Sequence, residues 1–386
     1  MSAQVNIFLL LFGGLQGLLL SLLLFKKKAF RTGYLFLIGY LLVMILQITL
    51  KVMSKMWLTG NMMPLYALSY QLPFLYGPFV YLFVRQVIGQ RSVILRDLIH
   101  FMPVIAVIIH LVFDDAYHYT PSLLIPLFDL KSRLVLQLVS LASYHAAAMY
   151  YWYSYQKDLK NKFSDLQKIR LGWLKKFIYG SFIVCMLIAV VIYLMYLWFP
   201  HHQDVRFGFV ALTIFIYWIS FSAWNQPEIF SVIRGFANEP VQAGIPKLIV
   251  HRSAKKYSNS GLSEGVIKKI IARLETIIQK NKLFLEADLT IDKLASDIPC
   301  SKHHLSQVLN DVLDKSFYDY INHYRVEEAR QLLIDPGKAG YKISSIAYDA
   351  GFNSVSTFNE VFRKFTGLTP SQFRKKPSQQ ARQQRV

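Results

Sequence analysis

The chain has 386 residues, of which 54% are hydrophobic, and a formal net charge of +20. This apolar share exceeds the ~45–50% of ordinary soluble domains, which excludes a purely water-soluble protein. Up to residue 227 there are 19 Lys and Arg, 7 Asp and no Glu, whereas the remainder has 24 Lys and Arg against 16 Asp and Glu. The composition therefore predicts a membrane part followed by a water-soluble part.

Seven apolar segments of the first part approach the ~20 residues that a helix needs to cross a bilayer. The first ends at "KKK" without a small-residue cleavage site, which indicates a retained span and not a removed leader. We expect a bundle of seven transmembrane helices within residues 1–225, with approximate spans 6–25, 33–50, 66–84, 98–113, 132–153, 177–199 and 207–224.

The distribution of basic residues among the loops predicts the orientation of this bundle. If the N-terminus lies outside, the inner loops 26–31, 85–97 and 156–176 hold 14 Lys and Arg, against 5 in the outer loops. Positive loops stay on the cytoplasmic side, so the C-terminal part is expected in the cytoplasm. Cys185 and Cys300 lie in different parts and are not expected to pair, which suits a reducing compartment.

Four residues of the membrane part are candidates for sensing a signal. His145 is an ionisable group in mid-span with Gln137 nearby, and ionisable groups within membranes are usually functional. The alternative is a neutral imidazole hydrogen-bonded to a neighbouring helix. Pro73 and Pro78 remove backbone donors from one span, which predicts a kink that lines a cavity or merely adapts the packing.

The soluble part begins after a linker at 226–261. The stretch 262–282 then places Val266, Ile270, Leu274, Ile277 and Ile278 at helical spacing, with Ser263 as the N-cap. This amphipathic helix is expected to pack on the following domain or, alternatively, on a second copy of itself.

Residues 289–311, "LTIDKLASDIPCSKHHLSQVLND", and 343–365, "ISSIAYDAGFNSVSTFNEVFRKF", look like divergent copies of one motif. Each has an apolar residue before Ala, a short turn and a Ser that can cap the next helix. This pattern is typical of a helix-turn-helix. The second turn is one residue longer, and Gly351 is expected to adopt a left-handed conformation there. The stretch 316–335 between the copies predicts a long connecting helix.

"LASDIPCSKHHLSQVLN", "INHYRVEEARQLL" and "IAYDAGFNSVSTFNEVFRKFTGLTPSQFRKK" resemble the DNA-binding domain of the AraC/XylS family of bacterial transcription regulators. The resemblance covers about 283–376, and the seven-span front resembles membrane-bound members of that family. It implies an all-α protein in the bacterial cytoplasmic membrane, whose two recognition helices enter successive major-groove faces about 34 Å apart. Pro299 and Cys300 stand in the first turn, where the family often has Gly.

Helix geometry selects the residues that would face DNA. If Leu305, Val308, Leu309 and Val312 are buried in the first copy, and Phe358, Val361, Phe362 and Phe365 in the second, the opposite faces are free to read bases. The base-reading candidates are His303, Ser306, Gln307, Asn310, Ser356, Asn359, Glu360 and Arg363. The phosphate-binding candidates are Ser301, Lys302, Ser354, Lys364, Arg374, Lys375 and Lys376.

The sequence therefore predicts a membrane-anchored transcription regulator with double-stranded promoter DNA, the lipid bilayer and an unknown small-molecule or membrane signal as partners. A homodimer on DNA and contact with RNA polymerase are further expectations. No catalytic motif, metal site or cofactor is expected, and the tail 377–386 is expected to be disordered. The alternative is a membrane transporter or channel with a regulatory cytoplasmic domain, against which stands the lack of an evident inverted repeat.

Overall fold

The computed structural model divides the chain into two compact units. The first comprises Met1–Ser154 and Leu171–Ala243, and the second Tyr155–Arg170 and Gly244–Val386. The structure describes residues 3–26, 34–53, 68–89, 95–106, 108–109, 130–166, 172–198, 209–225, 263–298 and 300–375. The expected linker at 226–261 and the expected tail at 377–386 lie outside these residues. Within them every regular element is helical, which confirms the all-α class.

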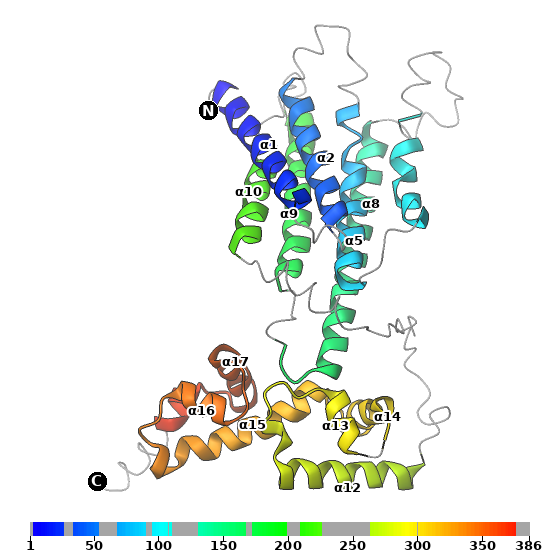
Figure 1. Cartoon of the computed structure of the whole chain (residues 1–386). Helices are drawn as coiled ribbons and strands as arrows, with labels where there is room; N and C mark the ends of the chain where they lie inside the picture. Colours follow the sequence, from blue (N-terminus) through cyan, green and yellow to red (C-terminus); the bar gives the residue numbers. More distant parts are fainter. Residues whose placement is uncertain are drawn as a thin grey trace. The chain divides into compact units, whose positions relative to one another are not determined.

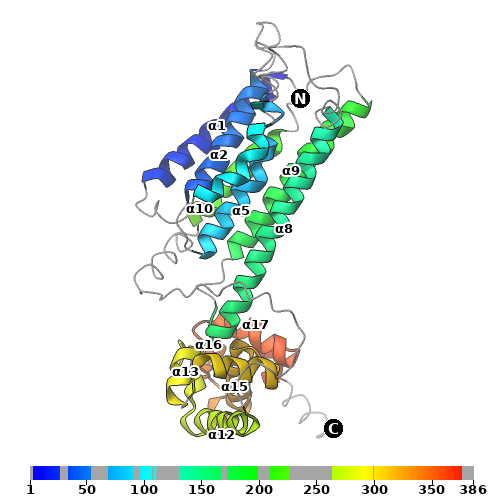
Figure 2. The ribbon, with the colours of Figure 1, turned by 90° about the vertical axis from the view of Figure 1, so that its right-hand side faces the viewer.

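The first unit is a bundle of long helices that run side by side (Figures 1 and 2). Its hydrophobic core includes Leu41 of α2, Phe83 of α5 and Phe177 of α9, and polar side chains such as Gln47 and His145 are buried in the same unit. Its elements are α1 (Ala3–Lys26), α2 (Tyr34–Val52), α5 (Pro73–Gly89), the 3₁₀ helix η2 (Leu95–Phe101), α8 (Leu130–Lys162), α9 (Gly172–Trp198) and α10 (Val210–Asn225).

Fewer helices than expected have the length and composition of a membrane span. Among the described residues three qualify, Ile7–Phe25, Leu35–Val52 and Gly172–Leu194, and Val210–Ser222 is apolar but shorter. The count of seven is therefore not confirmed. Helix α5 has only 17 residues and includes Pro78 and Arg85, and α8 is long but carries many polar side chains. The fourth expected span begins as the 3₁₀ helix η2 and continues as helix through residue 106, whereas residues 107 and 110–113 lie outside the described residues.

Helix α8 continues without a break past the boundary between the units. It has 33 residues, and its last turns together with residues up to Leu166 belong to the second unit. The sequence had suggested an inner membrane loop for 156–176. The structure groups Tyr155–Arg170 with the C-terminal helices, and the location of this segment on the inner side of a membrane stays a prediction.

The second unit consists of short helices arranged around α15 (Figure 1). Its first helix, α12, buries Ile270, Leu274, Ile277 and Ile278, while Val266 remains 41% exposed. The packing of α12 on its own domain is thus the alternative that the structure adopts, and the expected N-cap Ser263 is confirmed. The elements are α12 (Glu264–Asn281), η4 (Leu283–Leu285), α13 (Ile291–Asp297), α14 (Lys302–Gln307), the π-helical η5 (Val308–Val312), α15 (Phe317–Ile334), η6 (Pro336–Lys338), α16 (Ile343–Asp349) and α17 (Val355–Thr366).

Two separate hydrophobic cores share helix α15. Phe317 and Ile321, near its start, pack with α12, α13 and α14 in the first core. Ala329 and Leu333, near its end, pack with α16 and α17 in the second. The connecting helix expected at 316–335 is confirmed, and it joins two helix pairs, α13–α14 and α16–α17.

Candidate nucleic-acid interface

The first helix pair is built around capped helix starts. The hydroxyl of Thr290 accepts the Lys293 amide at 3.3 Å, which caps α13. The hydroxyl of Ser301 accepts the His304 amide at 3.2 Å, which caps α14. Such caps satisfy amides that have no partner within the helix, so the expected role of Ser301 as a cap is confirmed.

The second helix of this pair changes its winding after Gln307. Val308–Val312 is π-helical, with the Leu313 amide donating to the Val308 carbonyl at 3.1 Å. Val308 and Leu309 are buried as expected, but Val312 is 39% exposed, so its expected burial is wrong. The wider π turn rotates later residues relative to a regular helix, which moves Val312 off the face of Leu305.

The second helix pair has the expected turn. Gly351 has φ +84°, and Ser354 caps α17 by accepting the Thr357 amide at 3.1 Å. A β-carbon on Gly351 would lie 2.7 Å from the α-carbon of Leu285, so glycine is required by both conformation and space. Phe358, Val361 and Phe362 are buried as expected, whereas Phe365 is only half-buried.

The base-reading candidates differ between the two pairs. In the first, His303 is exposed while Ser306, Gln307 and Asn310 are half-buried, and the Asn310 amide donates to the Ser306 carbonyl at 2.7 Å. In the second, Ser356, Asn359, Glu360 and Arg363 are all exposed on α17. The second pair therefore presents the more accessible polar face, and contact of either face with bases remains a prediction.

Several phosphate-binding candidates already have partners within the chain. Lys302 pairs with Asp292 at 2.9 Å, and Lys364 pairs with Asp319 at 2.6 Å. Arg374 donates to the Tyr341 carbonyl at 2.8 Å. The Lys302–Asp292 pair is exposed on both sides and contributes little to stability, so a phosphate can replace the Asp292 carboxylate at small cost. Lys375 is exposed, and Lys376 lies outside the described residues.

Asp319 lies in the first turn of α15, where its carboxylate contacts Ser316, the N-cap residue of this helix, and Lys364 of α17 in the second pair. Its amide and one carboxylate oxygen bond the hydroxyl of Ser316 at 3.1 and 2.8 Å. Burial would raise the pKa of Asp319, but the hydrogen bonds from Lys364 and Ser316 outweigh it, so the pKa lies below its ordinary value. A negative charge near a helix N-terminus is also favourable.

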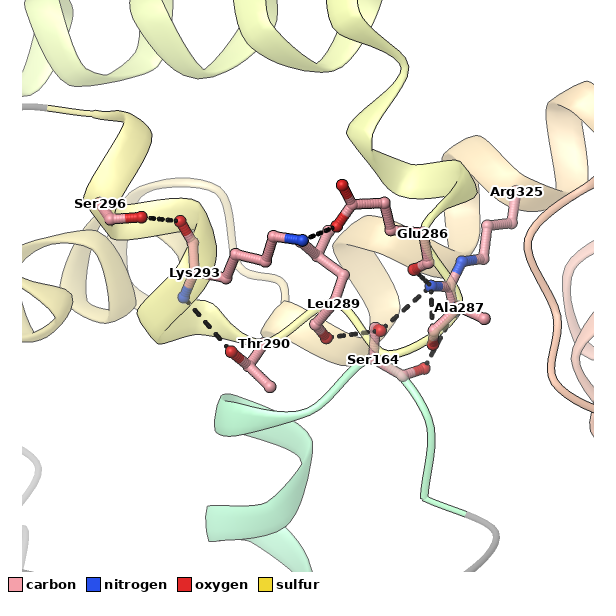
Figure 3. Close-up of polar contacts among 8 residues, drawn as sticks. All are labelled: Ser164, Glu286, Ala287, Leu289, Thr290, Lys293, Ser296 and Arg325. Carbon is pink, nitrogen blue, oxygen red and sulfur yellow. Dashed lines mark hydrogen bonds and ion pairs between the residues drawn. The ribbon is translucent and has the colours of Figure 1, made fainter.

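Sequence reasoning missed the most connected polar residue of the unit, Arg325. The residue is 1% exposed, and its guanidinium donates to the carbonyls of Phe284 and Glu286, each at 2.7 Å. It also donates to the carbonyl and hydroxyl of Ser164 at 3.4 and 3.1 Å (Figure 3). Burial lowers the pKa of Arg325 to about 10, against the opposing effect of Asp165, so the side chain stays cationic at neutral pH. Arg325 is four residues from both Ile321 and Ala329, so it lies on the same face of the helix as these apolar residues, and this spacing could have predicted its burial.

The four signal candidates occupy different places in the first unit. His145 is buried and bonded through its ring nitrogens to the Leu141 carbonyl at 2.8 Å and the Ser181 hydroxyl at 2.6 Å. This is the alternative of an imidazole bonded to a neighbouring helix. Gln137 and Pro73 line a cavity, and Pro78 lies inside α5. Among the described residues no group of three or more His, Cys, Asp or Glu is placed to hold a metal ion.

Residues 294–376, which include both second helices of the pairs, match the family model described as "Helix-turn-helix domain". The chain is also similar to proteins named HTH-type transcriptional activator RhaR from Escherichia coli (strain K12), Shigella flexneri serotype 5b and Escherichia coli O6:K15:H31. Each is 29% identical over 148 residues, 37% of this chain and 49% of the relative, so the chain spans about half the length of the curated relatives it matches. No solved structure matches it. The C-terminal part of the chain is therefore a helix-turn-helix domain similar to that of known transcriptional activators.

Proposed function

We propose that this chain is a membrane-anchored transcription regulator that binds promoter DNA through a double helix-turn-helix domain. The observation that carries the proposal is the pair of capped second helices, α14 and α17, both held on one helix, α15. Each presents side chains able to pair with base edges, such as Gln307 and Arg363. The similarity to RhaR proteins and the resemblance to the AraC/XylS family support the same function.

The membrane anchor is the second part of the proposal. Helices α1, α2 and α9 have the length and hydropathy of spans, and the other helices of the first unit would complete a seven-segment bundle. The basic loops favour a bacterial cytoplasmic membrane with the N-terminus outside and the DNA-binding domain in the cytoplasm. Cysteine labelling of intact cells tests this orientation. Labelling of the C-terminal domain from outside would overturn it.

Binding to DNA is tested with the full chain in nanodiscs. We expect selection from fragmented genomic DNA to enrich a set of related sites, with an affinity that falls steeply as salt rises. Binding that is insensitive to sequence and to salt would overturn the proposal. In the alternative function, a transporter or channel, the protein in proteoliposomes would move a solute without any dependence on DNA.

Two further partners belong to the proposal. A homodimer would place two such domains on paired half-sites, and an activator would contact RNA polymerase. Since the apolar face of α12 is largely buried in its own domain, a dimer would have to form through other surfaces. Sedimentation of the protein–DNA complex measures the number of chains per site.

A further inference from the structure

The residues that follow α8 pack in the C-terminal unit, against the helix-turn-helix domain. We define the α8 tail as residues 163–166, which come directly after the last residue of α8, Lys162. The tail belongs to the second unit but lies outside residues 294–376, the part of the chain that matches the helix-turn-helix model. Since α8 begins at Leu130, the tail is a segment that a helix of the first unit contributes to the second.

The tail lies beside the stretch that leads into α13. Phe163 forms an antiparallel β-bridge with Thr290, the N-cap residue of α13. The amide and the hydroxyl of Ser164 both donate to the Leu289 carbonyl, at 3.3 and 2.7 Å (Figure 3). These contacts fix the tail against the start of the first helix pair.

Ser164 also accepts hydrogen bonds from two buried side chains of α15. Its carbonyl accepts the Asn322 amide at 3.1 Å and the Arg325 guanidinium at 3.4 Å, and its hydroxyl accepts Arg325 at 3.1 Å. Each of these three residues is at most 1% exposed. Release of the tail would leave the donors without these acceptors until water reached them, and an unsatisfied buried donor is costly. The contacts therefore favour a docked tail.

Asp165 connects the tail to the second helix pair. Asn353, in the turn between α16 and α17, donates through its side-chain amide to Asp165 at 2.9 Å and to Asp288 at 2.8 Å. One amide group of the second pair thus meets both the tail and the stretch before α13. The tail therefore contacts both helix pairs and the helix that joins them.

The last turn of α8 adds a positive charge near the start of α15. Burial raises the pKa of Asp319, and the hydrogen bonds from Lys364 and Ser316 lower it. The charge of Lys160, in α8, lowers this pKa further. Because Lys364 belongs to α17, the end of α8 lies close to a second point at which α15 meets the second helix pair.

We infer that the α8 tail holds the two helix pairs in one relative orientation, so that its release changes the spacing between the DNA stretches that α14 and α17 read. Helix α15 joins the pairs through separate cores near its two ends. A segment that contacts both pairs and the middle of α15 restricts how they move against each other. The effect on DNA rests on the proposed function, whereas the docking of the tail does not.

The docking is tested without DNA, by a disulfide in the full chain in phosphatidylcholine nanodiscs. With Cys185 and Cys300 replaced by alanine, Phe163→Cys/Thr290→Cys should lose both free thiols on oxidation with diamide, because residues of a β-bridge lie within disulfide distance. The two single variants, which have no second thiol in the same chain, are the controls. A double variant that keeps both thiols would overturn the inference, whether or not the protein binds DNA.

The orientation is tested by the spacing ratio, which is the affinity for a selected site divided by that for the same site with one base pair inserted between its two recognised stretches. Ser164→Ala/Asp165→Ala removes side-chain contacts of the tail with both pairs and α15. We expect the ratio to fall about tenfold, the range of one or two hydrogen bonds. The matched control is Ser296→Ala/Asp297→Ala, the same dipeptide exposed on α13, which changes the charge equally and should leave the ratio unchanged.

The disulfide separates orientation from stability. Damage to the fold would lower the affinity for both sites alike, whereas oxidation of the disulfide in the Ser164→Ala/Asp165→Ala chain should restore the spacing ratio, and a reducing agent should lower it again. An unchanged ratio in the alanine variant, or a ratio that the disulfide does not restore, would overturn the inference.

A milder variant keeps the test decisive if the double alanine variant fails to fold. Asp165→Ala alone retains the contacts of Ser164 and should lower the spacing ratio by a few-fold, and no decrease would overturn the inference. Formation of the disulfide without sequence-specific binding to DNA would overturn the proposed function and not the docking of the tail.

Discussion

The guanidinium of Arg325 donates to the carbonyl of Ser164 at 3.4 Å and to its hydroxyl at 3.1 Å. The two residues are 161 positions apart in the sequence. Arg325 lies on α15 between the stretch that packs in the first core and the stretch that packs in the second. A buried cation surrounded by carbonyl groups holds several chain segments at once, because each acceptor lost leaves part of the charge without compensation. The guanidinium therefore joins three segments of the C-terminal unit, namely α15, the stretch 284–286 and the residues around Ser164.

Replacing Arg325 with lysine should destabilise the C-terminal unit by about 3 kcal/mol, since one ammonium cannot reach the same set of carbonyls. Hydrogen exchange of the full chain should show faster opening of η4 and α13. Arg330→Lys is the control, because Arg330 lies on the exposed side of α15 in an ion pair with Glu327 and should change little. Equal effects of the two substitutions would contradict the assigned role.

Among the described residues, Gly351 and Gly367 are the glycines with positive φ, and their replacement by alanine should cost different amounts of stability. Gly351→Ala meets the backbone of Leu285 at 2.7 Å and should cost about 3 kcal/mol, whereas Gly367→Ala has open space and should cost about 1 kcal/mol, the conformational penalty alone. Denaturant unfolding of the two variants measures the difference. If Gly367→Ala were the more damaging, the close packing of the second turn on η4 would not be supported.

Acidification should weaken the start of α15. The pKa of Asp319 is lower in the folded chain than in the unfolded chain. The ionised carboxylate therefore stabilises the fold fully at a pH above its unfolded pKa, and this stabilisation is lost as the pH falls through its folded pKa. Asp319→Asn should remove this dependence below about pH 4 and cost about 1 kcal/mol near neutrality. Thermal unfolding between pH 3 and 7 measures it, with the exposed Asp311→Asn as control. A wild-type profile identical to that of Asp319→Asn would refute the assignment.

The faces of α14 and α17 that we propose to read bases should each govern sequence preference at their own base positions. Gln307→Ala and Arg363→Ala should each cost about 1–3 kcal/mol on the selected site and relax the preference at one base position. The controls Gln279→Ala and Arg273→Ala, both exposed on α12, should leave affinity and preference unchanged. Competition binding to a library of single-base variants provides the measurement. A uniform loss across all bases would instead assign these residues to phosphates.

Contacts between residues close in the sequence could be predicted from it, and contacts between residues far apart could not. Ser301, Ser354 and Gly351 act within a few residues of themselves, so their caps and turn were foreseeable. Val312 escaped prediction because the π turn changes the helical register, which no short pattern announces. Arg325 escaped prediction because most of its acceptors are distant in sequence, among them the carbonyls of Phe284 and Ser164. Apolar composition likewise suggested seven spans, since it measures neither helix length nor interruption.

The division of α15 between two cores also has a consequence for how the domain would measure DNA. An α-helix turns by about 100° and rises 1.5 Å with each residue. One residue inserted between Val326 and Ala329 would therefore rotate the second reading face by more than a quarter turn around the axis of α15. The register of this one helix, more than any side chain on the surface, would decide which two stretches of a double helix can be read together.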